Sequence, residues 1–325
     1  MSKLISKAIG GYFELELPHQ KQHLYPEAIH LQSARATLYA LLIAGKPNRV
    51  WMPKYICDSM LAPLKATEIE TVFYGLESDF SVSNDVKLES DDWLLYVNYF
   101  GVCSYQENNL LKRFNPFQLI LDHSQAFFVP PRECLATIYS PRKFFGVPDG
   151  GLLVTSLFIE EPEEIDTGSV ERCKHLLIRL DSKPEAGYQH FKDADDSLQK
   201  IIQPLRMSKL TDRLLGSVDY IGVKRKRNSN FLTLHRLLKG FNNLMLHESQ
   251  IDGPLCYPLL LDDSTVRERL LANRVFVATY WPDVRGKVNV DDFEQRLVDY
   301  CLPIPCDQRY DTNDMERIVR IIKQD

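Results

Sequence analysis

The stretch that decides the fold runs from Phe117 to Thr155 and reads FQLILDHSQAFFVPPRECLATIYSPRKFFGVPDGGLLVT. Three short apolar runs in it, FQLIL, CLATIY and GLLV, have the length and the β-branched and aromatic content of buried strands. Asp122 stands where the first strand should end, and Lys143 lies just past the end of the second. An acid and an amine that leave the ends of neighbouring buried strands are typical of a ligand site on an open α/β sheet.

Helix and strand patterns alternate upstream of this stretch. Residues 34–44 are apolar and helix-favouring, Ser33 has the side chain of an N-cap, and Gly45 ends the helix. Further elements follow in the order strand RVWMP, a helix over 58–65, strand ETVFYG, strand WLLYVNYFG and a short helix in NNLLKRFN. This alternation predicts an α/β fold whose largely parallel sheet is covered by helices on both faces.

The pattern changes after Thr155. An acidic loop, EEPEEID, leads into a region of helices over 171–238, of which VKRKRNSNFLTLHRLL is the clearest. The C-terminal part predicts strand CYPLLLDD, a helix and a strand in VRERLLANRVFVATYWP, a loop, a short strand in LPIPCDQRY and a closing helix in DMERIVRIIKQ. We therefore expect a large α/β domain over 1–225 and a smaller α+β domain over 226–325. The opening GGYFELELP predicts a short edge strand or an arm that packs on a partner.

The composition narrows the class of protein. The 325 residues are 44% apolar and 26% charged, as in an ordinary globular protein, and the net charge of −5 argues against a nucleic-acid partner. No apolar run approaches the roughly 20 residues of a membrane span, and no secretory signal is evident at the N-terminus. Seven scattered cysteines without a CxxC pair predict reduced core thiols in a cytoplasmic protein, and the eight histidines lack metal-site spacing.

The acid, the amine and the upstream helix start together match the needs of one cofactor. Pyridoxal 5'-phosphate needs an amine for a Schiff base, a carboxylate at its ring nitrogen and main-chain N–H groups for its phosphate. Lys143, Asp122 and the helix start Ser33–Ala34–Arg35 supply these groups. Each residue alone has an ordinary structural explanation, so the prediction of a pyridoxal-phosphate site depends on the combination.

The same segments resemble the DegT/StrS aminotransferases, which are sugar aminotransferases of the aspartate-aminotransferase fold, or fold type I. SARATLYALL is similar to the family's Ser/Asn-Gly-Thr-Ala-Ala-Leu helix start, and LDHSQA to its Glu-Asp-Ala-Ala-Gln-Ala. YSPRKFFGVPDGGLLVT is similar to Phe-Tyr-Pro-Thr-Lys-Asn-Leu followed by a Gly-Gly strand start, and weaker likeness continues to LPIPCDQRY. The resemblance covers most of the chain and implies a mostly parallel seven-stranded sheet with a small C-terminal domain.

The resemblance also implies roles for particular residues. Lys143 would be the Schiff-base lysine and would carry the proton at the substrate carbon, and Asp122 would pair with the pyridinium nitrogen. Gln125 would contact the side of the ring that bears the hydroxyl. The phosphate would be held by Ser33, Ala34 and Arg35, mostly through their main chain, as expected at a helix N-terminus.

The ring-stacking position departs from the family pattern. Cys57 stands where the family usually has a large aromatic residue, which leaves the nearby Tyr55 or Tyr99 as candidates for the stacking side chain. His123 has two interpretations of similar weight, as a ring that stacks on the cofactor or as a hydrogen-bonded core histidine.

The phosphate end departs as well. Ile138 replaces a hydroxyl residue, whose contact Ser140 or Thr137 would take over. The family's Asn-Tyr-Arg segment, whose Asn reaches the neighbouring subunit's phosphate, is PLRMS here, with Pro204 at the Asn position. Among other candidates, we favour a solvated helix face for residues 224–227 over an anion site.

The resemblance implies a homodimeric pyridoxal-phosphate-dependent aminotransferase with small-molecule substrates. It would move an amino group from an amino acid to a keto acceptor, and the family suggests a nucleotide-linked keto sugar. Two alternatives stay open: a descendant that binds or regulates without turnover, and a pyridoxal-phosphate enzyme with other chemistry. In the dehydratase branch of the family a histidine replaces the lysine, so Lys143 counts against that branch.

Overall fold

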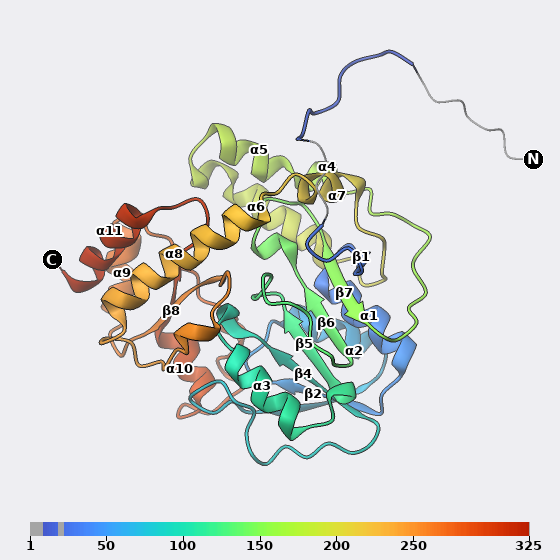
Figure 1. Cartoon of the computed structure of the whole chain (residues 1–325), viewed down its shortest axis with the longest axis horizontal. Coiled ribbons are helices and arrows are strands. Elements are labelled where there is room, and N and C mark those ends of the chain that lie inside the picture. Colours follow the sequence, from blue (N-terminus) through green and yellow to red (C-terminus); the bar gives the residue numbers. More distant parts are fainter. Residues whose placement is uncertain (1–8, 19–22, 325) are drawn as a thin grey trace, which may run out of the picture.

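The predicted apolar runs come together in one seven-stranded sheet (Figure 1) in the computed structural model, which describes residues 9–18 and 23–324. The strand order is β1-β7-β6-β5-β4-β2-β3, and every pairing among β2 to β6 is parallel. β7 runs antiparallel to β6, and β1 antiparallel to β7. The strands are β1 (Ile29–Leu31), β2 (Arg49–Pro53), β3 (Glu70–Tyr74), β4 (Asp92–Val97), β5 (Leu119–His123), β6 (Ala136–Tyr139) and β7 (Gly151–Thr155). The predicted mostly parallel sheet is confirmed.

The first helix starts where the sequence places its cap. In α1 (Ala34–Gly45) the Ser33 hydroxyl accepts a hydrogen bond from the Ala36 N–H at 3.1 Å, which satisfies one of the free donors of the first turn. The helix expected over 58–65 is divided into a 3-10 turn, Asp58–Met60, and the short α2 (Ala62–Ala66). α3 (Ser104–Arg113) lies between β4 and β5 in the chain.

The register of the sheet sets the position of the acid and the amine. Asp122 lies opposite Val97 of β4 on one side and opposite Ile138 of β6 on the other, so it occupies a central strand. β6 ends at Tyr139 and passes into a 3-10 turn, Pro141–Lys143. Because β5 and β6 are parallel, Asp122 and Lys143 come to the same edge of the sheet.

Helices dominate the rest of the chain. α5 and α6 form an antiparallel pair beside the sheet, and the long α8 runs from the large sheet to the C-terminal part (Figure 1). The predicted boundary between residues 225 and 226 therefore falls inside α8. The elements are α4 (Ser169–Arg172), α5 (Lys174–Asp181), α6 (Pro184–Gln199), α7 (Lys209–Leu215), α8 (Tyr220–Leu238), β8 (Cys256–Leu260), α9 (Thr265–Ala272), α10 (Phe293–Tyr300), β9 (Cys301–Pro305) and α11 (Thr312–Lys323).

Two details of the C-terminal prediction are wrong. The strand expected in RVFVATYW does not form, because β8 and β9 pair only with each other and leave this segment without a partner. Val275 and Val277 still pack into the core while Phe276 is exposed, and this alternation produced the strand signal. The loop expected before β9 contains α10.

The opening segment shows no strand over its described part, residues 9–18. Tyr12 and Phe13 there are exposed, so the arm is the alternative that stays open. No helix among the described residues is long and apolar enough to cross a membrane. The described residues also hold no group of three or more His, Cys, Asp or Glu side chains that could bind a metal ion.

Candidate active site

Asp122 is a buried carboxylate at the end of β5. Its Oδ1 accepts a hydrogen bond from the Ser124 N–H at 2.8 Å, which turns the chain as the strand ends. Burial raises the pKa of Asp122, and the hydrogen bonds from Ser124 and the electrostatic effects of His123 and Lys143 act in the opposite direction. A carboxylate that is desolvated in this way is stabilised by a cationic partner.

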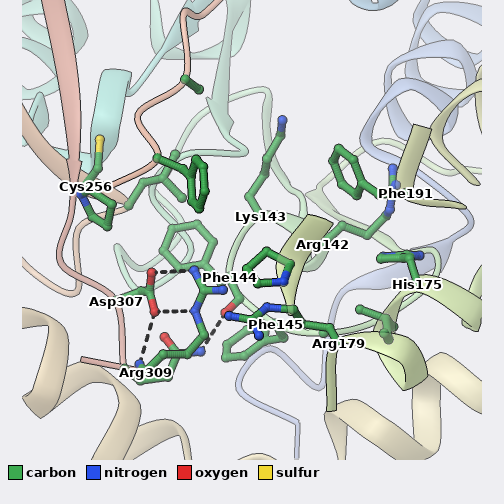
Figure 2. Close-up of a pocket in the computed structure, with 18 of the residues that line it drawn as sticks. Arg142, Lys143, Phe144, Phe145, His175, Arg179, Phe191, Cys256, Asp307 and Arg309 are labelled. Atoms are coloured by element: carbon green, nitrogen blue, oxygen red, sulfur yellow. Dashed lines mark hydrogen bonds and ion pairs between the residues drawn. The ribbon is translucent and has the colours of Figure 1, made fainter. Parts of the chain in front are cut away.

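Lys143 supplies a free amine at the same edge of the sheet. Its side chain is exposed and forms no hydrogen bond or ion pair with any described residue. It points away from Asp307 and Arg309 in Figure 2. It is also the only lysine among the residues that line the adjacent cleft, whose volume is about 710 Å³. The amine is therefore available to a ligand.

The cleft beside Lys143 lies between the α5–α6 pair and the C-terminal part of the chain. Figure 2 shows Arg142, His175 and Phe191 on one side and Asp307 with Arg309 on the other. Cations outnumber acids on these walls, and aromatic rings lie between the charges. Such a lining suits an anionic ligand that has an apolar or planar part. The residues that carry this lining are Arg142, Lys143, Phe144, Phe145, His175, Arg179, Tyr188, Phe191, Arg227, Phe276, Tyr280, Asp307 and Arg309.

The start of α1 is held tightly against the same region. Ser33 bridges to Gly150 just before β7, and a Cβ on Gly151 would lie 2.2 Å from the Ser33 carbonyl carbon. A Cβ on Gly150 would in turn lie 3.0 Å from the ring of Pro141, two residues before Lys143. The three predicted parts, the helix start, the acid and the amine, therefore gather at one end of the sheet.

The segment PLRMS also lies beside this helix start. The Gln32 side chain donates to the Gln203 carbonyl at 2.9 Å and accepts from the Leu205 N–H at 2.7 Å. The Gln32 main-chain N–H donates to the Leu205 carbonyl at 3.0 Å. These bonds hold Pro204 next to α1 of its own chain.

The stacking candidates lie in different environments. The rings of Tyr55 and Tyr99 are buried, and Tyr55 packs 4.5 Å from Trp281, centroid to centroid. Neither residue lines the cleft. Cys57 is half-buried, and its Sγ lies 3.0 Å from the Ser59 hydroxyl.

Two other residues predicted to contact the cofactor, Gln125 and His123, form hydrogen bonds within the protein. The side-chain oxygen of Gln125 accepts a hydrogen bond from the Phe100 N–H at 2.6 Å. His123 lies 2.7 Å from Glu107, Nε2 to Oε1, and both side chains are fully buried. This is the hydrogen-bonded core alternative for His123. Ser140 is buried at the start of the 3-10 turn, and its side chain forms no cap hydrogen bond.

Two buried charged residues near the site, Arg227 and Glu107, were missed in the sequence. Arg227 is buried, contrary to the solvated face expected for residues 224–227, and it lies beneath Phe144 next to Lys143. Its guanidinium donates to the carbonyls of Pro254 and Leu255. Neighbouring Arg225 is exposed. The two arginines differ in burial because they lie on different faces of α8. Glu107 was missed because its burial depends on contacts with distant strands.

No family model matches the sequence, and no curated protein matches it either. Solved structures do match the fold. The sugar aminotransferase CalS13 from Micromonospora echinospora has a TM-score of 0.63 at 14% identity, covering 92% of this chain and 87% of that one. Helicobacter pylori PseC, an aminotransferase involved in the biosynthesis of pseudoaminic acid, gives 0.61 at 15% identity, covering 91% and 86%. NtdA from Bacillus subtilis, solved with bound cofactor PMP, gives 0.63 at 17% identity, covering 91% and 73%.

The chain therefore has the fold of the DegT/DnrJ/EryC1/StrS-type sugar aminotransferases, which is fold type I of the pyridoxal-phosphate enzymes. The resemblance seen in the sequence motifs is confirmed at the level of the fold. At identities of 13–17% the match concerns the fold, and function has to be argued from the site.

Proposed function

We propose that the protein is a pyridoxal-phosphate-dependent aminotransferase in which Lys143 and Asp122 carry the chemistry. One observation carries the proposal: a buried carboxylate and an unpaired amine leave adjacent parallel strands at one edge of the sheet. Burial raises the pKa of Asp122, and the nearby charge of Lys143 partly opposes that rise. The named activity of the structural neighbours supports the same class of reaction.

The residues present fit the cofactor at both reacting positions. Asp122 would hold the ring nitrogen, Lys143 would bind the carbonyl carbon, and the N–H groups at the start of α1 would hold the phosphate. When bound, pyridoxal phosphate supplies an electron sink for the bond that breaks at the substrate carbon. Desolvation of Asp122 is then offset by the positive ring nitrogen, which explains why a buried acid is kept at this position.

Different residues of the chain would move the proton, hold the ring nitrogen and orient the substrates. Lys143 would be the base that takes the proton from the substrate carbon and returns it at the next position. Asp122 would hold the proton on the ring nitrogen. The cationic walls of the cleft would orient the carboxylate of the amino donor and the anionic part of the acceptor.

A nucleotide-linked keto sugar is the acceptor that we propose. The structurally similar DesI was solved in the presence of its TDP-sugar product. The cleft beside Lys143 combines arginines with aromatic rings, which suits a diphosphate joined to a base. A cytoplasmic location and a homodimer belong to the same proposal.

Absorbance spectroscopy with added pyridoxal phosphate tests the assignment. Wild-type protein should develop a visible band, and borohydride reduction should fix the cofactor on Lys143, located by peptide mass. Lys143→Ala should lose both signals. The exposed Lys174→Ala is the matched control and should keep both. A Lys143→Ala protein with an unchanged band would refute the role of Lys143.

A binding protein without turnover is the second candidate. It is favoured by the phosphate end, where Pro204 replaces the family's Asn. Incubation of the loaded protein with amino acids separates the two candidates. Conversion of the cofactor to its amine form supports the aminotransferase, and a stable cofactor with every amino acid supports the binding protein.

A further inference from the structure

Two arginines that the family motifs do not contain lie at the phosphate end of the site. Arg35 is the second residue of α1, and Arg142 immediately precedes Lys143. Both reach the same helix, α6, which passes over this end of the sheet. Arg35 meets its last turn, and Arg142 meets Asp195 one turn earlier.

Arg35 is a buried cation whose partners do not complete its hydrogen bonding. Its side chain is 6% exposed, and Nη2 donates to the carbonyls of Leu198 at 2.5 Å and Ile201 at 3.4 Å. Its Nε is buried and has no partner, and no carboxylate bonds to the guanidinium among the described residues. Burial lowers the pKa of Arg35, which means that the charge is poorly compensated.

Arg142 has a counter-ion that a ligand can displace. Its Nη1 and Nη2 lie 3.2 and 3.3 Å from the same oxygen of Asp195, so the pair lacks the two-oxygen geometry of a strong guanidinium–carboxylate contact. Asp195 is 41% exposed, and exposed pairs of this kind contribute little stability. Replacing Asp195 by another anion at Arg142 therefore costs little free energy.

The two arginines act on one another. Arg35 bonds to the Leu198 carbonyl and Arg142 bonds to Asp195, three residues earlier on α6, so the three groups share one neighbourhood. Burial is the main cause of the lowered pKa of Arg35, the charge of Arg142 adds to this shift, and the charge of Asp195 opposes it. Two cations with one exposed acid leave an excess of positive charge beside the N–H groups that begin α1. A group with two negative charges would satisfy both guanidinium ions at once.

We propose that Arg142 and Arg35 are the side chains that bind the phosphate group at the start of α1, and that Asp195 is the counter-ion that this phosphate displaces from Arg142. The proposal rests on the proposed function, because the phosphate is that of the cofactor. The ligand class is a phosphate monoester dianion. The guanidinium ions compensate for the hydroxyl lost at Ile138 and the amide lost at Pro204.

Binding of pyridoxal phosphate, of pyridoxal and of inorganic phosphate to the apo-protein tests this arrangement. Arg142→Ala should weaken pyridoxal phosphate binding by about tenfold to a hundredfold, the usual effect of losing a charge-assisted contact, and should leave pyridoxal binding unchanged. Asp195→Asn should strengthen binding of pyridoxal phosphate, since the competitor is gone. Arg225→Ala, which removes an exposed arginine of α8 that does not line the cleft, is the control and should change neither ligand.

Thermal stabilisation by inorganic phosphate separates this proposal from the assignment of Lys143. Phosphate should stabilise wild-type and Lys143→Ala proteins alike and should stabilise Arg142→Ala less. If Lys143→Ala still binds covalent cofactor while phosphate stabilisation depends on Arg142, the proposed function fails and the phosphate site stands. The phosphate proposal would be overturned if Arg142→Ala weakened the binding of pyridoxal and of pyridoxal phosphate equally. It would also be overturned if Asp195→Asn did not tighten the binding of pyridoxal phosphate.

Discussion

Replacing Glu107 by alanine should destabilise the protein more than any surface change. Glu107 is fully buried, and one of its oxygens accepts from the Asn98 amide at 2.9 Å and lies 2.7 Å from His123 Nε2. Removing it leaves two buried polar groups without their partner. At about 1–3 kcal/mol for each unsatisfied group, the free energy of unfolding should fall by roughly 2–6 kcal/mol.

The loss should also reach the cofactor site. Asn98 donates from its main chain to the Asp122 carbonyl at 3.0 Å, and His123 follows Asp122 on β5. A loosened Asn98 and His123 therefore displace the end of the strand that carries the acid. Cofactor affinity in Glu107→Ala should fall even at temperatures where the protein stays folded.

Urea unfolding followed by circular dichroism measures the stability, with exposed Glu133→Ala as the control. The control should stay within about 0.5 kcal/mol of wild type. Glu107→Gln, which keeps an acceptor of the same shape, should lose less than Glu107→Ala. A Glu107→Ala midpoint equal to that of the control would refute the reasoning, because it would mean that the buried pair contributes nothing net.

Three further changes have defined outcomes. Gly151→Ala places a Cβ 2.2 Å from the main chain at the start of α1 and should cost about 1–3 kcal/mol by calorimetry, whereas Gly240→Ala, with open space, should be neutral. Burial raises the pKa of Asp122, so the folded apo-protein holds this proton more tightly than the unfolded chain does. The stability that protonated Asp122 contributes is fully present below the ordinary pKa of 3.8 and is lost as the pH rises through the raised pKa. The melting temperature of wild type should therefore fall over this pH range. Asp122→Asn should not show this fall and should melt at a higher temperature than wild type at neutral pH. Arg227→Ala should lower the unfolding free energy by about 2–4 kcal/mol, and a loss equal to that of the exposed Arg225→Ala would show that the buried cation is not stabilising.

Local patterns were sufficient to predict most of the seven-stranded sheet. Buried parallel strands are recognised in a sequence as short apolar runs, and Ser33 before an apolar stretch indicates a helix start. β2 to β7 and α1 therefore lie close to where the sequence predicts them. The same logic failed for RVFVATYW, since an alternating apolar pattern reports burial of one face and says nothing of a partner strand. Asp122 and Lys143 were predictable because the end of a strand fixes where its next side chain emerges.

The sequence by itself determined the order of elements, the edge of the sheet at which the acid and the amine emerge, and the likeness to fold type I. Only the tertiary structure decided which charged side chains are buried. Arg227 and Arg225 look alike in the sequence and are separated by the face of α8 that each occupies, whereas Glu107 is buried on α3 and Glu133 is exposed in a loop. The neighbours of Arg35 and Arg142 were equally hidden, because α6 follows Arg35 by some 150 residues and reaches it only through packing. Burial and ion pairing depend on contacts between distant segments, and local residue patterns do not encode them.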